Sequence, residues 1–191
     1  LGVMTNNRFH FGIGVSPWYE DFLATGERWE KRGKRMDEQI TILRGLMDGD
    51  YFGFKGDFYD IPDLKLCPVP SQPVPILIGG HSKLALKRAA KLGDGWISAG
   101  ITLEETKDFI NQINSYREEF GTLDHPNYQF QVMGEAAYSP DGVRALEDLG
   151  ATDVIVAFRN AYEGGPDERT LDSMKAEISW YADEVINKFR G

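Results

Sequence analysis

Short apolar runs alternate with longer polar segments along most of the chain. In RFHFGIGVSPW every second residue is apolar up to Ser16-Pro17, which predicts a strand with one face made of Phe9, Phe11, Ile13 and Val15. The run PILIG shows no polar alternation, which is typical of a strand buried on both faces of a parallel sheet. Further strands are predicted in GWISAG, YQFQVMGEAAYS and TDVIVAF.

Between these strands the apolar residues recur at helical spacing. The helices predicted in this way cover about residues 27–47, 83–92, 103–120 and 140–150, and a final segment that carries apolar residues from Leu171 to Val185. Five strands that alternate with five helices indicate parallel strands joined by right-handed crossovers. The expected fold class is therefore α/β, either an open parallel sheet or a (β/α)8 barrel.

The alternation is interrupted once. The segment from about 49 to 74 is first aromatic and then rich in proline, which favours an extended excursion over the surface. With 191 residues, 41% of them hydrophobic, the chain can bury a core of its own. We therefore expect a single domain over 1–191 with a surface excursion at about 49–74. Because the chain begins at Leu1, close to its first strand, we interpret it as a fragment or a processed chain.

The charge and the apolar runs of the chain argue against two classes of partner. A formal net charge of −9 makes a nucleic-acid partner unexpected, because phosphate binding needs a basic face. One predicted helix does carry Lys83, Lys87, Arg88 and Lys91, and there a solvated helix face is favoured over a polyanion site. No apolar run approaches the roughly 20 residues that span a bilayer, so no membrane association is expected.

A single cysteine, Cys67, cannot form an internal disulfide. No CxxC or HxxxH spacing is present, so no metal site is predicted. A reduced, cytoplasmic location follows as the expectation.

In α/β folds of this kind, ligands bind at the carboxyl ends of the strands. That rule selects five candidate segments: 14–20, 79–82, 98–102, 133–139 and 158–163.

Gly79-Gly80-His81-Ser82 is the most informative of these segments. Two glycines let the backbone turn sharply and approach a ligand closely. Ser82 can cap the helix that begins at Lys83, where backbone N–H groups and the helix dipole favour an anion. On spacing alone, a plain strand-to-helix turn with a serine cap is favoured over a phosphate site.

The other polar candidates have simpler interpretations. A histidine at a helix start, such as His81, more often donates a hydrogen bond than acts as an acid or base, and His10 and His125 are weaker candidates. Glu20 and Asp21 stand before a predicted helix, where their negative charges interact favourably with the positive end of the helix dipole. The glycines of Gly93-Asp94-Gly95 precede a strand, so this turn is expected at the opposite, structural end of the sheet.

Several motifs together resemble the bacterial luciferase-like monooxygenase family. These are the glycine-rich strand end at Gly12 and Gly14, the Arg32–Glu38 stretch of the long helix, the Gly56–Tyr59 turn, the proline-rich approach to Ile-Gly-Gly, and Gly-Asp-Gly-Trp at 93–96. The resemblance runs from Arg8 over nearly the whole chain. Ser16-Pro17-Trp18 together with EDF at 20–22 is most similar to the branch that uses a deazaflavin coenzyme, F420, rather than FMN.

The resemblance implies a (β/α)8 barrel of which about five βα units are present, with the N-terminal strands missing. It also implies a flavin or deazaflavin at the carboxyl ends of the strands. The cofactor-binding residues that it suggests are Gly14, Val15, Ser16, Gly79, Gly80, His81 and Ser82. The catalytic residues stay unassigned: deazaflavin-dependent sugar-phosphate dehydrogenases place a glutamate near the end of this first strand, where this chain has Pro17.

Three functions follow as hypotheses. The first is an oxidoreductase that transfers a hydride between F420 and an unknown small organic substrate. The second is an FMN-dependent monooxygenase. The third is a truncated, non-catalytic flavin-binding or interaction protein. Since five strands cannot close an eight-stranded barrel, we expect a homodimer or another association through the open sheet edges, and a poorly active isolated chain.

Overall fold

A computed structural model describes residues 1–159 and 165–190. The chain forms two compact units. The first contains residues 1–96 and 113–128, and the second contains 97–112 and 129–191, as far as they are described. In both units parallel strands are covered by helices, which confirms the predicted α/β class. The single domain expected over 1–191 stays a prediction.

The first unit is built on a central buried strand. Its strands are β1 (Phe11–Ile13), β4 (Ile76–Gly79) and the start of β5 (Gly95–Ile97), and β4 lies between the other two. β1 and β4 are parallel, with Ile13 opposite Ile78. The three isoleucine and leucine residues of β4 are at most 1% exposed, which is why this strand carries no polar alternation.

Helices of the first unit follow the strands in sequence. They are α1 (Tyr19–Thr25), α2 (Arg32–Met47), α3 (Lys83–Leu92) and the last turns of α4 (Leu103–Phe120). α3 packs on β4 through one apolar face, formed by Ala85, Leu86, Ala89 and Ala90. The three alanines of this face are small, so they permit a close approach between helix and strand.

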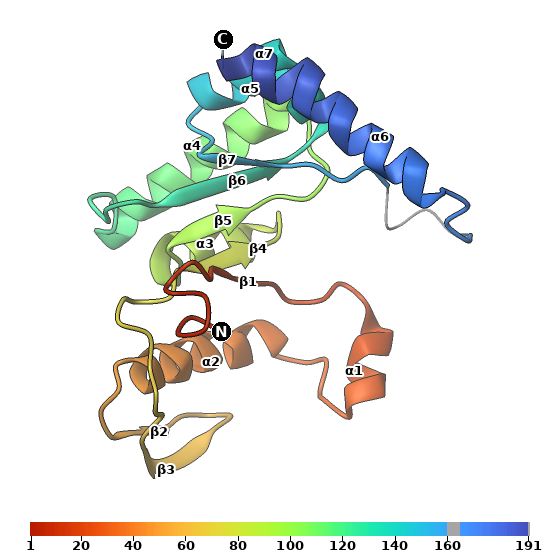
Figure 1. The fold of residues 1–191 in the computed structure, drawn as a ribbon. Coiled ribbons are helices and arrows are strands. Elements are labelled where there is room, and N and C mark those ends of the chain that lie inside the picture. Colours follow the sequence, from red (N-terminus) through yellow and green to blue (C-terminus); the bar gives the residue numbers. More distant parts are fainter. Residues whose placement is uncertain (160–164, 191) are drawn as a thin grey trace. The chain divides into compact units, whose positions relative to one another are not determined.

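The predicted excursion contains a hairpin. β2 (Phe52–Lys55) and β3 (Asp60–Leu64) pair in antiparallel fashion, with an irregular register between Phe52 and Phe54. Its turn is fastened to α2 by Glu38, whose carboxylate accepts the backbone N–H groups of residues 57, 58 and 59 at 2.7, 3.0 and 3.1 Å. The hairpin therefore lies beside α2 (Figure 1).

The second unit pairs β6 (Gln129–Met133) with β7 (Asp153–Ile155) in parallel. Its helical elements are the first turns of α4, the 3₁₀ helix η1 (Glu135–Tyr138), α5 (Pro140–Asp148), α6 (Leu171–Tyr181), the π-helical turn η2 (Ala182–Ile186) and α7 (Asn187–Arg190). Its core includes Phe130, Val132, Leu146 and Val185. The Tyr181 hydroxyl donates to the Ala137 carbonyl at 2.8 Å, which ties the C-terminal helices to η1.

Several predicted boundaries were wrong. β1 covers 11–13 rather than 9–15, and α2 begins at Arg32 rather than Glu27, because Lys31 has a left-handed φ of 57°. The short helix α1 was not predicted. The strand expected through Ser139 ends at Met133, and the 3₁₀ helix η1 begins at Glu135.

None of the helices within 1–159 and 165–190 has the length and apolar character needed to cross a membrane.

Candidate cofactor site

Two of the predicted segments come together in the first unit. The register of β1 and β4 places the residues after Ile13 beside those after Ile78. A Cβ atom added to Gly14 would lie 3.7 Å from the Gly79 carbonyl oxygen, so the two backbones are in near contact. The loop that begins at Gly14 and the turn Gly79–Ser82 thus form one edge, at the carboxyl ends of two neighbouring parallel strands.

The turn needs glycine at one position in particular. Gly80 has a φ of +117°, a conformation that other residues rarely adopt. A Cβ atom at Gly80 would also lie 3.0 Å from the Cβ of Ala85. The backbone therefore passes close over the start of α3.

Ser82 caps α3, as the simpler interpretation of the sequence predicted. Its hydroxyl accepts the backbone N–H of Ala85 at 3.2 Å. The first turn of α3 contains no acidic side chain. In α4, by contrast, Thr102 and Glu105 form a reciprocal capping box, with bonds of 2.9 and 3.2 Å. The start of α3 thus keeps the positive end of its dipole without an acidic neighbour in its own first turn.

His81 lies half-buried against Trp96. The two ring centroids are 6.0 Å apart, with 57° between the ring planes. Trp96 is fully buried, and its indole N–H donates to the Gly80 carbonyl at 2.9 Å. Sequence reasoning missed Trp96 as a partner of the turn; the one available signal was that the N–H of a buried tryptophan usually has an acceptor.

The Gly14–Ser16 loop is ordered by its own side chains. The Ser16 hydroxyl donates to Asp21 at 2.5 Å and accepts the backbone N–H of Trp18 at 3.1 Å. Glu20 and Asp21 lie in the first turn of α1, where their charge suits the helix dipole. Val15 is half-buried.

In the remaining predicted segments, the described residues make contacts within the fold. Ser98 is 2% exposed, and its hydroxyl accepts the backbone N–H of Met133 at 2.9 Å. Gly134 packs against the backbone at Ile101. Of the segment 158–163, residues 160–163 lie outside the described residues.

The turn Gly93-Asp94-Gly95 has structural partners. Asp94 accepts from the backbone N–H of Ile76 at 2.7 Å and from Arg44 at 2.8 Å, and Nε2 of His125 lies 3.1 Å from its other oxygen. His125 therefore serves this cluster, at the start of β4 and β5.

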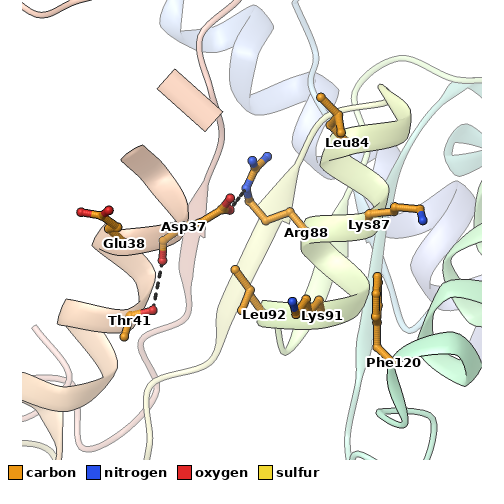
Figure 2. A pocket seen from close by; sticks show the side chains of 9 residues that line it. All are labelled: Asp37, Glu38, Thr41, Leu84, Lys87, Arg88, Lys91, Leu92 and Phe120. Atoms are coloured by element: carbon orange, nitrogen blue, oxygen red, sulfur yellow. Dashed lines mark hydrogen bonds and ion pairs between the residues drawn. The ribbon is translucent and has the colours of Figure 1, made fainter. Parts of the chain in front are cut away.

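Two of the four cations on the basic face of α3 have acidic partners, and Figure 2 shows one of these pairs, Arg88 with Asp37. Arg88 donates to Asp37 of α2 at 2.5 Å, and Lys87 lies 3.3 Å from Glu119. The groove between these helices has a volume of about 390 Å³. Because acidic partners neutralise Arg88 and Lys87, the structure supports the interpretation as a surface helix face.

The residues at the joined edge fit an anionic group such as a phosphate. They offer a glycine turn without side-chain obstruction, a serine hydroxyl and the acid-free start of a ten-residue helix. Within the described residues, no group of three or more His, Cys, Asp or Glu side chains is arranged to hold a metal ion.

Sequence relatives cover the chain well. An uncharacterized protein of Mycobacterium tuberculosis is 45% identical over 188 residues, which are 98% of this chain and 64% of that protein. The F420-dependent glucose-6-phosphate dehydrogenase of Amycolatopsis mediterranei is 32% identical over 78% of this chain and 46% of its own length. The FMNH(2)-dependent dimethylsulfone monooxygenase of Pseudomonas fluorescens is 35% identical over 59% of this chain and 32% of its own. The chain thus spans less than two thirds of the length of these relatives.

Solved structures with the same fold are similar to the chain at low sequence identity. The coenzyme F420-dependent tetrahydromethanopterin reductase of Methanopyrus kandleri matches with a TM-score of 0.72 at 14% identity, over 97% of this chain and 76% of that one. An F420-dependent secondary alcohol dehydrogenase matches with a TM-score of 0.62 at 22% identity, over 78% and 46%. Together with the parallel α/β architecture, these matches confirm the predicted fold class.

The family model of the luciferase-like monooxygenases matches residues 1–174. It covers both segments of the joined edge, and its match agrees with the motifs and with the parallel α/β architecture. The chain belongs to the luciferase-like monooxygenase family.

Proposed function

We propose that this chain is part of an F420-dependent oxidoreductase and holds the coenzyme at the joined edge of β1 and β4. When bound, the deazaflavin would exchange a hydride with an organic substrate of unidentified structure. The residues that would hold the coenzyme are Gly14, Val15, Ser16, Gly79, Gly80, His81 and Ser82. F420-dependent enzymes among the relatives support this choice of coenzyme.

The observation that carries the proposal is the near contact between Gly14 and Gly79 beside the start of α3. One segment, Gly79–Ser82, would receive the phosphate at the helix start. The other, Gly14–Ser16, would face the ring system or its side chain. Trp18 is 47% exposed at the end of this loop and offers an aromatic surface there.

A direct titration tests the proposal. Purified chain would be titrated separately with F420 and with FMN, and binding followed by coenzyme fluorescence. We expect saturable binding of F420 that is tighter than binding of FMN. Tighter FMN binding would favour the alternative, an FMN-dependent monooxygenase, which the dimethylsulfone monooxygenase relative supports. Binding of neither coenzyme would contradict both and favour a non-catalytic interaction protein.

We also propose that the chain associates through the open edge of β1, as a homodimer or with another chain that supplies strands. β1 is the outer strand of its unit, and a hollow of about 600 Å³ lies beside it. The apolar residues that line this hollow include Phe11, Ile13, Met36, Ile42, Leu43 and Ile61. An open strand edge beside an apolar hollow favours pairing with a further strand.

Sedimentation velocity tests this association. We expect self-association of the wild type that rises with concentration and is reduced by Ile13→Lys. Leu84→Lys is the control, because Leu84 is 74% exposed on α3, away from the hollow. A chain that stays monomeric at all concentrations, or a monomer with full turnover, would contradict the proposal. The lone exposed Cys67 agrees with a reduced setting, and we propose a cytoplasmic location.

A further inference from the structure

We propose that Trp96 is a positioning residue for the cofactor turn Gly79–Ser82; this inference rests on the proposed function. Trp96 belongs to the Gly-Asp-Gly-Trp motif, whose first three residues serve the opposite end of the strands. Its indole instead reaches the turn, where Nε1–H donates to the Gly80 carbonyl at 2.9 Å.

The indole is a rigid support for this bond. Trp96 is 0% exposed, so packing fixes its ring. The acceptor belongs to Gly80, whose φ of +117° is rarely adopted by other residues and where an added Cβ atom would lie 3.0 Å from the Cβ of Ala85. The hydrogen bond therefore joins a fixed donor to a glycine whose backbone could otherwise adopt several conformations.

Holding the Gly80 carbonyl also sets the direction of the next amide. The only cis peptide bond among the described residues is Cys67-Pro68, so the bond between Gly80 and His81 is trans. In a trans peptide the C=O and N–H groups point in opposite directions. With the carbonyl turned toward Trp96, the His81 N–H points away from the indole, and the peptide plane at the start of the site is fixed.

The same ring supports the side chain of His81. The His81 ring lies 6.0 Å from the Trp96 ring. Trp96 thus contacts both the peptide between Gly80 and His81 and the side chain of His81, the residue that precedes the cap Ser82. A coenzyme phosphate at this turn would meet a preorganised backbone rather than a flexible loop.

Trp96→Phe is the direct test, because it keeps an aromatic ring and removes only the N–H donor and the second ring. We expect F420 to bind about fivefold more weakly, which corresponds to about 1 kcal/mol at 1.4 kcal/mol per tenfold change. Hydrogen–deuterium exchange in the peptide that covers 79–86 should become faster. Trp29→Phe is the matched control: Trp29 packs against Phe22 and Tyr19 near α1, and both readouts should stay at the wild-type level.

A measurement on the wild type covers the case in which Trp96→Phe does not fold. The four indole N–H signals can be assigned by NMR from Phe variants at Trp18, Trp29 and Trp180, with Trp96 identified by elimination. Saturating F420 should shift the Trp96 signal. Wild-type binding with an unshifted signal, or with unchanged affinity and exchange in Trp96→Phe, would overturn the positioning role alone. If the wild type binds neither F420 nor FMN, the proposed function fails, and this inference fails with it.

Discussion

Asp94 and Arg44 form an ion pair that joins the start of β5 to α2. Nη2 of Arg44 donates to Oδ2 of Asp94 at 2.8 Å, and the same oxygen accepts the backbone N–H of Ile76 at 2.7 Å. The Asp94 side chain is 14% exposed, so solvent screens these bonds only in part. One carboxylate thus links two strands and a helix of the first unit.

We expect Asp94→Asn to lower the free energy of unfolding by about 2 kcal/mol, since hydrogen bonds to charged groups contribute roughly 1.5–3 kcal/mol. Urea unfolding followed by circular dichroism would measure the loss. Asp60→Asn is the control, because Asp60 pairs with Lys55 at 71% and 83% exposure and should change stability by less than about 0.5 kcal/mol. Equal losses of unfolding free energy in the two variants would show that the contacts of Asp94 do not stabilise the first unit more than an exposed ion pair does.

Ser82→Ala separates the capping role from cofactor binding. Loss of the bond to Ala85 should lower stability by about 1 kcal/mol, the usual cost of removing a helix cap. Ser139→Ala removes an equivalent cap, a 3.1 Å bond to Gly142 at the start of α5 in the other unit. Under the proposed function, Ser82→Ala alone should also weaken F420 binding in a fluorescence titration. If both variants bind F420 with the same affinity, Ser82 caps the helix but does not contact the coenzyme.

Gly80→Ala tests the need for glycine in the turn. Its φ of +117° and the 3.0 Å approach to Ala85 would strain an alanine, so we expect a stability loss above about 1 kcal/mol and weaker F420 binding. Gly26→Ala is the matched control: Gly26 has a φ of +69°, but a Cβ atom there meets nothing within 4 Å. This control should lose stability through its backbone alone and keep its affinity. Wild-type affinity in Gly80→Ala would argue against a coenzyme at the turn.

Much of the fold could be predicted from the pattern of apolar residues, because burial of apolar side chains is the main force that sets this pattern. β4 and α3 were predicted almost to the residue. The uninterrupted apolar run of β4 and the regular apolar face of α3 each indicate directly which side chains are buried. The hairpin of β2 and β3 was seen only as an excursion. Its strands are short and bulged, and the carboxylate that anchors its turn belongs to Glu38, which is distant in sequence.

The candidate site was predictable to the same degree. The rule of carboxyl ends selected Gly14 and Gly79, and the parallel register brings them together. Contacts made by side chains from the next strand were not predictable, because the bond from Trp96 to Gly80 depends on how β4 and β5 align. The contacts of Asp94 with Arg44, Ile76 and His125 were not predictable for the same reason.

We expect acidic pH to lower the stability of the protein by protonating Asp167, which lies before α6. Two hydrogen bonds from Arg169, at 2.8 and 2.9 Å, hold the pKa of the Asp167 carboxyl well below its usual range. A depressed pKa means that this carboxylate stabilises the fold above the unfolded value, which is about 3.9, and that the contribution is lost as pH falls toward the folded value. Wild-type melting temperature should therefore exceed that of Asp167→Asn by a constant margin above about pH 5, and the margin should narrow below about pH 4.

Thermal melts of both proteins between neutral and acidic pH would measure this margin. Asp141→Asn is the control, since Asp141 is 99% exposed beside Arg144 and its margin should stay near zero throughout. A margin for Asp167→Asn that is the same at acidic and at neutral pH would show that the pair with Arg169 does not stabilise the charged carboxylate. In that case the contacts of Arg169 with the Phe158 carbonyl and with Glu177, both at 2.9 Å, would suffice to hold the loop.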